Sequence, residues 1–469
     1  MPKVQACFWF DVEDYITPES DDALKALLDI FEERGARGTW KLVGEKYRVL
    51  RSRQRKDIIE ALHRQDVGYH TDNHSQHPTI SEYARGLSWQ AGADEFAARE
   101  WCGFEELRQE FGAISCYGQP GGAWAPQAFD VMRRWGIPMY LDEGRHVGLG
   151  KRPFWFQNVL TAFNLQENCV RVDISRDDKV AALREARRRF DSTAERLKGE
   201  GGLISLYYHP CEFATSEFWD GVNFSNGRNT PRAEWKGAPL LSREEAAARL
   251  RTFAELLDLA LSHADVEVVD AEQLAAAYQP HRGSLQLAST ELARIATDLR
   301  GGISCAASSE GWLSPAQVFS GLAEALTAWA EAGEVPRSVE LSSPLGPARR
   351  VGVPADGRTT VADVVRAARQ ARAAIKAANR LPDAVWLGAT EIGPGTAFAA
   401  MSQVLAAALA GGAAESVAIS SPRLLLEDQV GADEREMWGW TIFPRGFSAP
   451  DLLELTRLQT WTMKPATPV

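Results

Sequence analysis

The first seventy residues alternate short strand-like runs with amphipathic stretches, and this alternation constrains the fold more than any other feature. Strands are predicted over residues 4–10, 39–44 and 66–70, and helices over residues 21–33 and 53–64. In the first helix, Leu24, Leu27, Leu28 and Phe31 recur at helical spacing. A strand–helix–strand–helix–strand order predicts a parallel sheet with right-handed crossovers.

The same pattern continues to about residue 278. Further helices are predicted over residues 90–111, 127–135, 179–198 and 242–261, and further strands over residues 114–117, 139–141, 203–210 and 266–269. The helix at 242–261 opens with Ser242-Arg243-Glu244-Glu245, a capping-box pattern. Residues 212–239 are aromatic-rich without a period, so we expect a long loop over a functional site.

Acidic and histidine side chains gather where these predicted strands end. The strand-end residues are Asp11, Glu13, Asp14, His70, His74, Asp142 and His209. Ligands of parallel sheets bind at the carboxyl ends of the strands, so we expect these side chains to meet. Two histidines four apart on a helical turn share one face and can bind one metal ion. The acids after the first strand are the expected anionic partners.

Two acids compete for that third ligand position. If the strand stays extended beyond Asp11, Glu13 points to the same side as Asp11 and completes the site. If the chain turns after Val12, Asp14 reaches the ion instead.

A metal held by two histidines and a carboxylate keeps positions open for water and a substrate oxygen. Such an ion lowers the pKa of its bound water and polarises a carbonyl group. A second carboxylate can take a proton from the water, and a remote imidazole can protonate the leaving group. This set of groups suits hydrolysis of an amide or an ester.

Three motifs resemble those of the polysaccharide deacetylases of the NodB-homology type, carbohydrate esterase family 4. They are His70-Thr71-Asp72-Asn73-His74, Phe10-Asp11-Val12-Glu13-Asp14 and Leu206-Tyr207-Tyr208-His209-Pro210. The acidic motif is similar to the variant in the peptidoglycan-deacetylase and allantoinase-like branch. The resemblance covers about residues 4–275.

The resemblance implies a distorted, partly open (β/α) barrel and a single divalent metal ion, zinc, as cofactor. It implies that Asp11 is the general base, His209 the general acid, and His70 and His74 metal ligands together with Glu13 or Asp14. The implied substrate is an acetylated carbohydrate such as peptidoglycan or a chitin-like glycan.

The chain departs from the family at one motif. The family's Arg-x-Pro-x-Gly, whose arginine braces the base, is here Gly118-Gln119-Pro120-Gly121-Gly122. Gln119 can hydrogen-bond the base but carries no charge, so we expect Asp11 to lack a cationic partner. The residues expected to contact substrate are Gln119, Pro120, Gly121, Trp124, Asp142 and Tyr208.

Residues 1–279 and 284–469 are predicted to be two domains joined by a linker at 279–283. The second is Ala-rich and contains a repeat of about 46 residues, in which Ser314, Val318 and Pro336 return as Thr360, Val364 and Pro382. A third partial unit starts at Gly395. We expect a mainly helical domain that dimerises or binds a glycan. The repeats are weakly similar to pseudomurein-binding repeats, which implies a cell-wall anchor.

Composition excludes several classes of protein. The 469 residues are 45% hydrophobic and 25% charged, and the net charge of -11 argues against nucleic-acid and anionic-membrane partners. Six cysteines without paired spacing indicate a reducing compartment rather than a disulfide framework. No signal peptide or membrane-spanning run is visible, so a cytoplasmic location is expected. This expectation conflicts with the cell-wall anchor that the repeats imply.

Three functions follow as hypotheses. The first is a metal-dependent carbohydrate deacetylase, and the second is an amidohydrolase of a small cyclic amide or ureide, which the missing arginine favours. The third is a catalytically silent glycan-binding protein that retains a metal.

Overall fold

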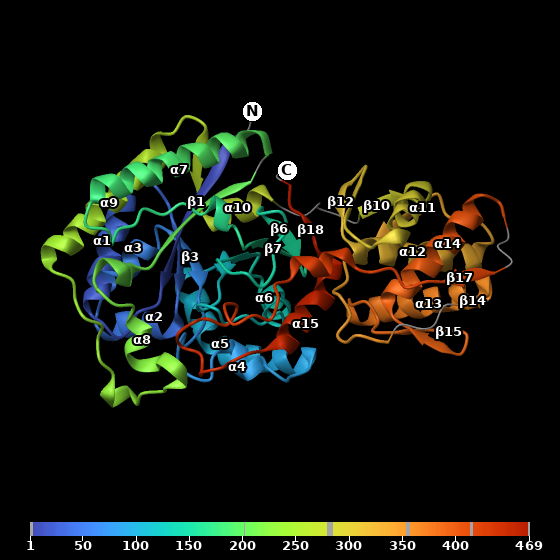
Figure 1. Ribbon diagram of the computed structural model, residues 1–469, viewed down its shortest axis with the longest axis horizontal. Coiled ribbons are helices and arrows are strands. Elements are labelled where there is room, and N and C mark those ends of the chain that lie inside the picture. The colour runs from blue at the N-terminus through green and yellow to red at the C-terminus, as the bar shows by residue number, and fades with distance from the viewer. Residues whose placement is uncertain (1–2, 201, 279–284, 353–356, 413–415, 468–469) are drawn as a thin grey trace.

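The computed structural model describes residues 3–200, 202–278, 285–352, 357–412 and 416–467, and its larger part is built around a large, mostly parallel sheet (Figure 1). The strand order is β18-β6-β7-β5-β4-β3-β2-β1-β8, and β9 also pairs with β1. The strands are β1 (Val4–Val12), β2 (Thr39–Leu42), β3 (Asp66–Tyr69), β4 (Cys116–Tyr117), β5 (Met139–Leu141), β6 (Phe154–Phe156), β7 (Val159–Ala162), β8 (Leu203–Tyr208), β9 (Val266–Val269) and β18 (Lys464–Pro465).

The pairings from β9 and β8 through β1 to β5 and β7 are parallel, whereas β6 and β18 run antiparallel to their neighbours. The path begins at β18 and ends at β8, so the sheet curls without closing. With helices around it, this is the distorted, partly open (β/α) barrel that the motif resemblance implied. Its helices are α1 (Glu19–Glu33), α2 (Gly44–Ser52), α3 (Lys56–Leu62), α4 (Ile80–Ala84), α5 (Trp89–Phe111), α6 (Ala128–Trp135), α7 (Lys179–Glu200), α8 (Trp219–Phe224), α9 (Arg243–Ser262) and α10 (Ala271–Ala277).

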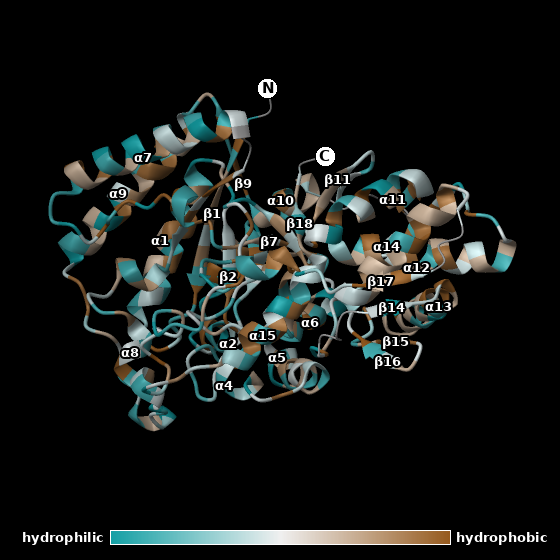
Figure 2. Ribbon diagram, turned by 45° about the vertical axis from the view of Figure 1, so that its right-hand side comes forward, coloured by the Kyte–Doolittle hydropathy of each residue, from teal (hydrophilic) through white to brown (hydrophobic). Residues whose placement is uncertain are grey.

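Strand β1 is buried along nearly its whole length because both of its faces are covered. Phe8 and Phe10 pack against Phe31 of α1 and Phe253 of α9. Trp9 points the other way, into a separate cluster inside the barrel. Figure 2 shows hydrophobic residues along β1, while α7 is largely hydrophilic. Successive residues alternate between the faces, so Trp9, Asp11 and Glu13 share the inner side.

The predicted strands and helices of the barrel are present with shifted ends, and several short elements are additional. Helix α2 starts at Gly44, where the sequence predicted the end of a strand, and the hairpin of β6 and β7 was not predicted. Residues 212–239 were expected to be structureless but contain α8, in which Trp219 is buried. Ser242 caps α9 by accepting a hydrogen bond from the backbone N–H of Glu245, as expected.

A second group of helices lies beside the barrel (Figure 1). Its elements are β10 (Leu285–Ala288), α11 (Ser289–Asp298), β11 (Ala306–Ser308), β12 (Gly311–Leu313), α12 (Pro315–Ala332), β13 (Ser338–Leu341), β14 (Gly357–Thr359), α13 (Val361–Ala378), β15 (Val385–Leu387), β16 (Thr390–Ile392), α14 (Pro394–Leu409) and β17 (Val417–Ile419). The strands form two-stranded sheets, β10 with β13, β11 with β12, β14 with β17 and β15 with β16. The predicted linker at 279–283 lies outside the described residues.

The 46-residue repeat corresponds to structure. Ser314 and Thr360 are the N-caps of α12 and α13, and each accepts a hydrogen bond from the backbone N–H three residues later. Val318 and Val364 are buried one turn further along. The repeat therefore fixes where two helices begin and which face they bury.

Residues 425–465, called here the return segment, run back onto the barrel. Val430 pairs with Val147 in an antiparallel bridge, and Thr456 of α15 (Pro450–Gln459) accepts a hydrogen bond from the indole of Trp124. Strand β18 then pairs with β6. The end of the predicted 284–469 unit thus forms part of the sheet built by residues 1–279. None of the helices among the described residues is long and apolar enough to cross a membrane.

Candidate active site

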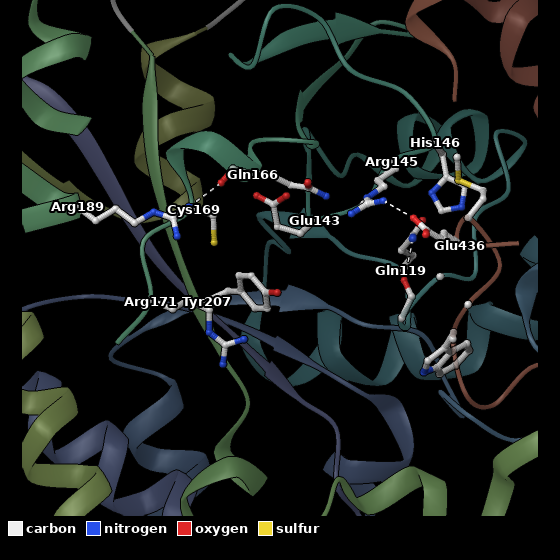
Figure 3. A pocket seen from close by; sticks show the side chains of 16 residues that line it. Gln119, Glu143, Arg145, His146, Gln166, Cys169, Arg171, Arg189, Tyr207 and Glu436 are labelled. Carbon is white, nitrogen blue, oxygen red and sulfur yellow. Dashed lines mark hydrogen bonds and ion pairs between the residues drawn. The ribbon is translucent and has the colours of Figure 1, made fainter. Parts of the chain in front are cut away.

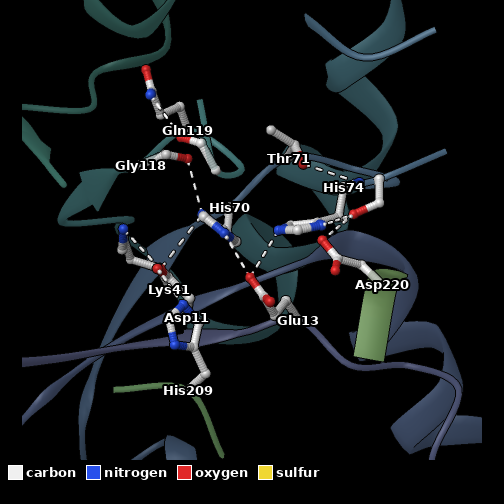
Figure 4. A network of polar contacts seen from close by, with 12 residues as sticks. Asp11, Glu13, Lys41, His70, Thr71, His74, Gly118, Gln119, His209 and Asp220 are labelled. Carbon is white, nitrogen blue, oxygen red and sulfur yellow. Dashed lines mark hydrogen bonds and ion pairs between the residues drawn. The ribbon is translucent and has the colours of Figure 1, made fainter. Parts of the chain in front are cut away.

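The carboxyl ends of the parallel strands bring the predicted residues together (Figure 4). Asp11 and Glu13 come from the end of β1 and the residue after it, His70 follows β3, Asp142 follows β5 and His209 follows β8. All five are almost fully buried or only slightly exposed. A cavity of about 690 Å³ opens over them, with Asp11, Glu13, His74, Asp142 and His209 in its walls.

Glu13 faces both histidines of the first motif. Its Oε2 lies 3.2 Å from His70 Nε2 and 2.8 Å from His74 Nε2. The ligand atoms of these three residues all lie within 4.8 Å of one another. The Oδ1 of Asp14 instead accepts backbone hydrogen bonds from Ile16 and Thr17, which fixes the turn after β1. Because the strand stays extended to Glu13, this acid joins the cluster.

The two histidines do not lie on a helical turn, contrary to the prediction. Thr71 and His74 have φ values of 68° and 51°, so the segment is a tight loop with left-handed residues. The hydroxyl of Thr71 accepts a hydrogen bond from the backbone N–H of His74. This turn brings the two imidazoles to 5.0 Å between ring centres.

Neighbouring groups orient each imidazole towards Glu13. His70 Nδ1 lies 3.1 Å from the carbonyl oxygen of Gly118, which only accepts, so Nδ1 carries the proton. His74 Nδ1 lies 2.6 Å from Ser75 Oγ, and that hydroxyl donates to Asp220. Both Nε2 atoms then present lone pairs to the carboxylate. Two lone pairs and a carboxylate at this spacing repel one another unless a cation lies between them. The three side chains therefore form a candidate cation site.

The Oε1 of Glu13 accepts a hydrogen bond from the indole N–H of Trp219, 2.8 Å away, which keeps Oε2 directed at the histidines. Burial acts to raise the pKa of Glu13, but when an imidazole beside it is protonated, the charge of His74 and the hydrogen bonds from His70 and His74 outweigh burial and hold the pKa of Glu13 well below its usual range. The carboxylate is therefore the stable form at neutral pH.

Asp11 has a cationic partner, which corrects the expectation drawn from the missing arginine. Lys41 Nζ on β2 lies 2.8 Å from Asp11 Oδ1 and 2.7 Å from Asp142 Oδ2, and its side chain is fully buried. A side chain at Gly118 would place its Cβ 2.1 Å from this ammonium group. The glycine that replaces the arginine thus leaves the space that Lys41 fills.

Lys41 also decides between overlapping groups of acids and histidines. Asp11, His70 and Asp142 are close enough to share an ion, but the ammonium group already lies between the two carboxylates. Burial raises the pKa of Asp142, Lys41 opposes this and Asp11 reinforces it, with a result of about 7. The set of Glu13, His70 and His74 is consequently the better cation site.

His209 lies on the other side of Asp11, with Nε2 3.6 Å from Asp11 Oδ2. Its Nδ1 contacts Glu212 at 3.1 Å, and Arg171 holds both oxygens of Glu212 at 2.7 Å. Burial acts to lower the pKa of His209, but the hydrogen bond to Glu212 and the charges of Glu13, Glu212 and Asp11 raise it to about 9. His209 is therefore protonated at neutral pH.

The residues expected to contact substrate are divided between the cavity and the core. Gly121 and Asp142 line the cavity. Trp124 and Tyr208 are fully buried, Trp124 against Phe163 and Tyr208 against Phe253, so both are core residues. Pro120 is also buried.

Gln119 does not contact the candidate base. Its side chain donates to the Gly121 carbonyl and accepts from the hydroxyl of Tyr140.

Four cavity or partner residues were missed from the sequence: Lys41, Tyr207, Glu212 and Trp440. Tyr207 lines the cavity because strand alternation turns it inward and Tyr208 outward. The signal for Lys41 was a single charge inside an otherwise buried strand, since such a charge needs a partner. Trp440 comes from the return segment, more than 200 residues after the last motif.

No family model and no curated protein matches the chain. Several solved structures are similar to it. A protein from Mycobacterium smegmatis described as a polysaccharide deacetylase is 16% identical over 59% of this chain and 90% of that one, with a TM-score of 0.37. A mutant peptidoglycan deacetylase from Bacillus subtilis is 12% identical over 58% and 91%, with a TM-score of 0.30. A 4-alpha-glucanotransferase from Thermococcus litoralis is 10% identical over 64% and 45%, with a TM-score of 0.41.

Proposed function

We propose that this protein is a metal-dependent hydrolase that removes acetyl groups from an N-acetylated or O-acetylated carbohydrate. The observation that carries the proposal is the arrangement of Glu13, His70 and His74 beside Asp11 and His209 in one cavity. A cation site, a braced carboxylate and a protonated imidazole are groups that metal-assisted hydrolysis of an amide or ester can use.

Glu13, His70 and His74 would hold the ion. Two neutral imidazoles and a carboxylate are a common ligand set for zinc, which we propose as the metal. When bound, a divalent ion lowers the pKa of water and polarises the acetyl carbonyl. Ser75, Gly118 and Trp219 keep the three ligands oriented through the hydrogen bonds described above.

Asp11 is the proposed general base. Lys41 fixes its Oδ1, which leaves Oδ2 directed at the cavity and at His209. Oδ2 accepts the proton of the attacking water. Lys41 holds the carboxylate of Asp11 at one position before the reaction.

His209 is the proposed general acid. Glu212 keeps it protonated and orients the ring, so that Nε2 can give a proton to the leaving nitrogen or oxygen. For an N-acetyl group the products are acetate and a free amine. The proton that His209 gives up is balanced by the one that Asp11 takes from water.

The missing arginine was an argument in favour of the ureide hypothesis. Lys41 supplies a cation at that place, so this argument for a change of substrate no longer holds. The silent glycan-binding hypothesis predicts binding without turnover, and the experiment below separates it from the deacetylase.

The test combines metal analysis with acetate release. Purified protein should contain about one zinc-class ion per chain and release acetate from acetylated chito-oligosaccharides or peptidoglycan, with allantoin as the ureide comparison. His74→Ala should lose both the metal and the activity. His63→Ala is the matched control, because His63 is a surface histidine paired with Glu110. Acetate release that survives His74→Ala would contradict the proposal.

A further inference from the structure

The cavity over the candidate site has two walls that differ in what they contact. Four residues line both this cavity and a second one of about 550 Å³ beside it: Gly121, Glu143, Tyr207 and Trp440 (Figure 3). Within the described residues, the lining of the second cavity includes none of the proposed metal ligands and none of the groups that orient them. Helix α8 belongs to the opposite wall, and it is the wall that reaches the ligands.

Helix α8 is fastened to the loop that carries the two histidines. His77 Nε2 donates to the carbonyl oxygen of Phe224, at the end of the helix, with 3.0 Å between the atoms. The side-chain amide of Asn229 donates to the carbonyl oxygen of His77 at 3.1 Å. At the start of the helix, the indole of Trp219 donates to the carboxylate ligand. These contacts fix the position of the acid that follows Trp219, which is Asp220.

Asp220 reaches His74 through one serine (Figure 4). Ser75 Oγ donates to Asp220 Oδ2 at 3.2 Å, and His74 Nδ1 lies 2.6 Å from the same serine oxygen. Both Ser75 and Asp220 are fully buried. Bulk water therefore does not compete for these hydrogen bonds.

The direction of the two hydrogen bonds decides which nitrogen of His74 can bind an ion. A serine hydroxyl has one hydrogen, and an ionised carboxylate only accepts. Because the hydrogen of Ser75 is directed at Asp220, the serine oxygen accepts from His74 Nδ1, and Nε2 of the neutral ring keeps its lone pair. If the hydroxyl donated to Nδ1 instead, the ring hydrogen would lie on Nε2, and that atom could not bind an ion.

His70 does not have this choice. Its Nδ1 faces the backbone carbonyl of Gly118, which only accepts, so the ring hydrogen is fixed by the main chain. The hydroxyl beside His74 can donate or accept, so a third group is needed to set its direction. Asp220 is placed to be that group.

We infer that Asp220 is a positioning residue of the metal site, which acts through Ser75 to select the ring form of His74 that can bind a divalent ion. This inference rests on the proposed function, because it takes His74 as a ligand of the ion. Hydrogen-bond partners of metal-bound histidines orient the ring, and their loss usually weakens metal binding about 10–100-fold.

The test measures zinc affinity by competition with a chromophoric chelator. Asp220→Asn keeps the size of the side chain and should weaken zinc binding about 10–100-fold. The new amide can donate to Ser75, which frees the hydroxyl to donate to His74 Nδ1. Asp177→Asn is the matched control, because it makes the same change at an exposed position before α7, and it should leave the affinity unchanged. Zinc affinity that Asp220→Asn leaves unchanged would overturn the inference.

A double-mutant cycle separates an effect through Ser75 from a general loss of negative charge near the ion. Ser75→Ala should weaken zinc binding by a similar factor, and adding Asp220→Asn to it should cause almost no further loss, because the hydroxyl that links the two groups is already absent. Thermal unfolding of each metal-free variant confirms that it is folded. Two losses that multiply would show that Asp220 acts by its charge alone, and the inference would be wrong.

Proton magnetic resonance at saturating zinc gives a second readout that a purely structural role would not change. The Nδ1–H of His74 should give a downfield resonance, because it donates a short hydrogen bond to a hydroxyl that itself donates to a carboxylate. This resonance should move upfield in Asp220→Asn and stay in place in Asp177→Asn. An unmoved resonance in Asp220→Asn would contradict the inference.

Zinc binding and acetate release are measured separately, which distinguishes this inference from the proposed function. Zinc binding that Asp220→Asn weakens, in a protein that releases no acetate from any substrate, would support the inference and refute the deacetylase. Acetate release by a protein whose zinc affinity is the same with Asp220 and with asparagine at that position would support the deacetylase and overturn the inference.

Discussion

At the scale of single residues, one buried and one partly exposed ionic group flank the proposed base. Lys41 lies between Asp11 and Asp142, and Arg171 holds Glu212 against His209. Removal of one member from a buried pair is costly because it leaves an uncompensated charge, whereas exposed pairs contribute little. Each group can therefore be tested by deleting one charge.

Lys41→Met should lower the free energy of unfolding by about 3–5 kcal/mol, because Asp11 and Asp142 would face each other without a cation. It should also lower kcat by about 10²-fold or more, since the base loses its fixed position. Urea unfolding and acetate release measure the two effects.

The double change Lys41→Met and Asp142→Asn should recover part of the stability by removing one unpaired charge, without recovering kcat. Lys25→Met is the control, because Lys25 forms a surface pair with Asp29 on α1 and should change stability by less than about 1 kcal/mol. Stability that Lys41→Met leaves unchanged would show that the ammonium group does not brace the site.

Glu212→Gln should move the basic limb of the pH–rate profile to lower pH. Glu212 helps to raise the pKa of His209 to about 9, so the imidazole is protonated below that value and loses its proton as pH rises through it. The contribution of protonated His209 to the stability of the fold is complete below the ordinary histidine pKa of about 6.5 and is lost as pH rises through about 9. Without the carboxylate, the proton is lost at lower pH.

Profiles of kcat/KM for both proteins measure this shift. Glu185→Gln, a change in a surface ion pair with Arg176, should leave the basic limb in place. A basic limb at the same pH in Glu212→Gln and the unchanged protein would exclude His209 as the acid that titrates.

At the scale of elements, the repeat beyond the barrel determines helix starts. Ser314 and Thr360 each cap a helix, and α14 begins without a side-chain cap at Gly393. The reciprocal hydrogen bonds of Ser314 and Gln317 satisfy backbone donors that the first turn of α12 leaves free.

Ser314→Ala should therefore destabilise the protein by about 1 kcal/mol, as is usual for loss of an N-cap. Urea unfolding followed by far-ultraviolet circular dichroism measures the change. Ser192→Ala, within the exposed face of α7, is the control and should have an effect below about 0.5 kcal/mol. Equal effects of the two changes would argue against the cap.

At the scale of the whole molecule, the return segment connects the end of the chain to the site. Its residues pair with β6, bond to Trp124 and bury Ile442 beside Tyr15 and Trp219. The indole of Trp219 donates a hydrogen bond to Glu13, a proposed metal ligand. Through Trp219, the C-terminal segment therefore helps to position that ligand.

Ile442→Ala should lower the free energy of unfolding by about 2–5 kcal/mol through the cavity it leaves. It should also raise KM, because Trp440 lies two residues away in the wall of the cavity over the candidate site. Leu261→Ala, at an exposed position near the end of α9, is the control and should change neither quantity appreciably. Unchanged stability in Ile442→Ala would show that the segment is only loosely attached.

Local sequence patterns are sufficient to predict the parallel sheet and to place most of the proposed catalytic residues at one edge of it, whereas the barrel and the roles of these residues were implied by the motif resemblance. The strand and helix periods are local, and parallel strands bring their carboxyl ends to one edge, so the pattern alone places Asp11, His70 and His209 together. The equivalent repeat positions Ser314 and Thr360 likewise coincide with two helix starts.

Tertiary packing selects the partner of each of these groups. Glu13 rather than Asp14 faces the histidines because of where β1 ends. Tyr207 rather than Tyr208 lines the cavity because its side chain is on the inner face of β8. Lys41 and Trp440 meet the site across the sheet and from the far end of the chain. Such contacts depend on packing between segments that are distant in sequence, which a local pattern of polar and apolar residues does not encode.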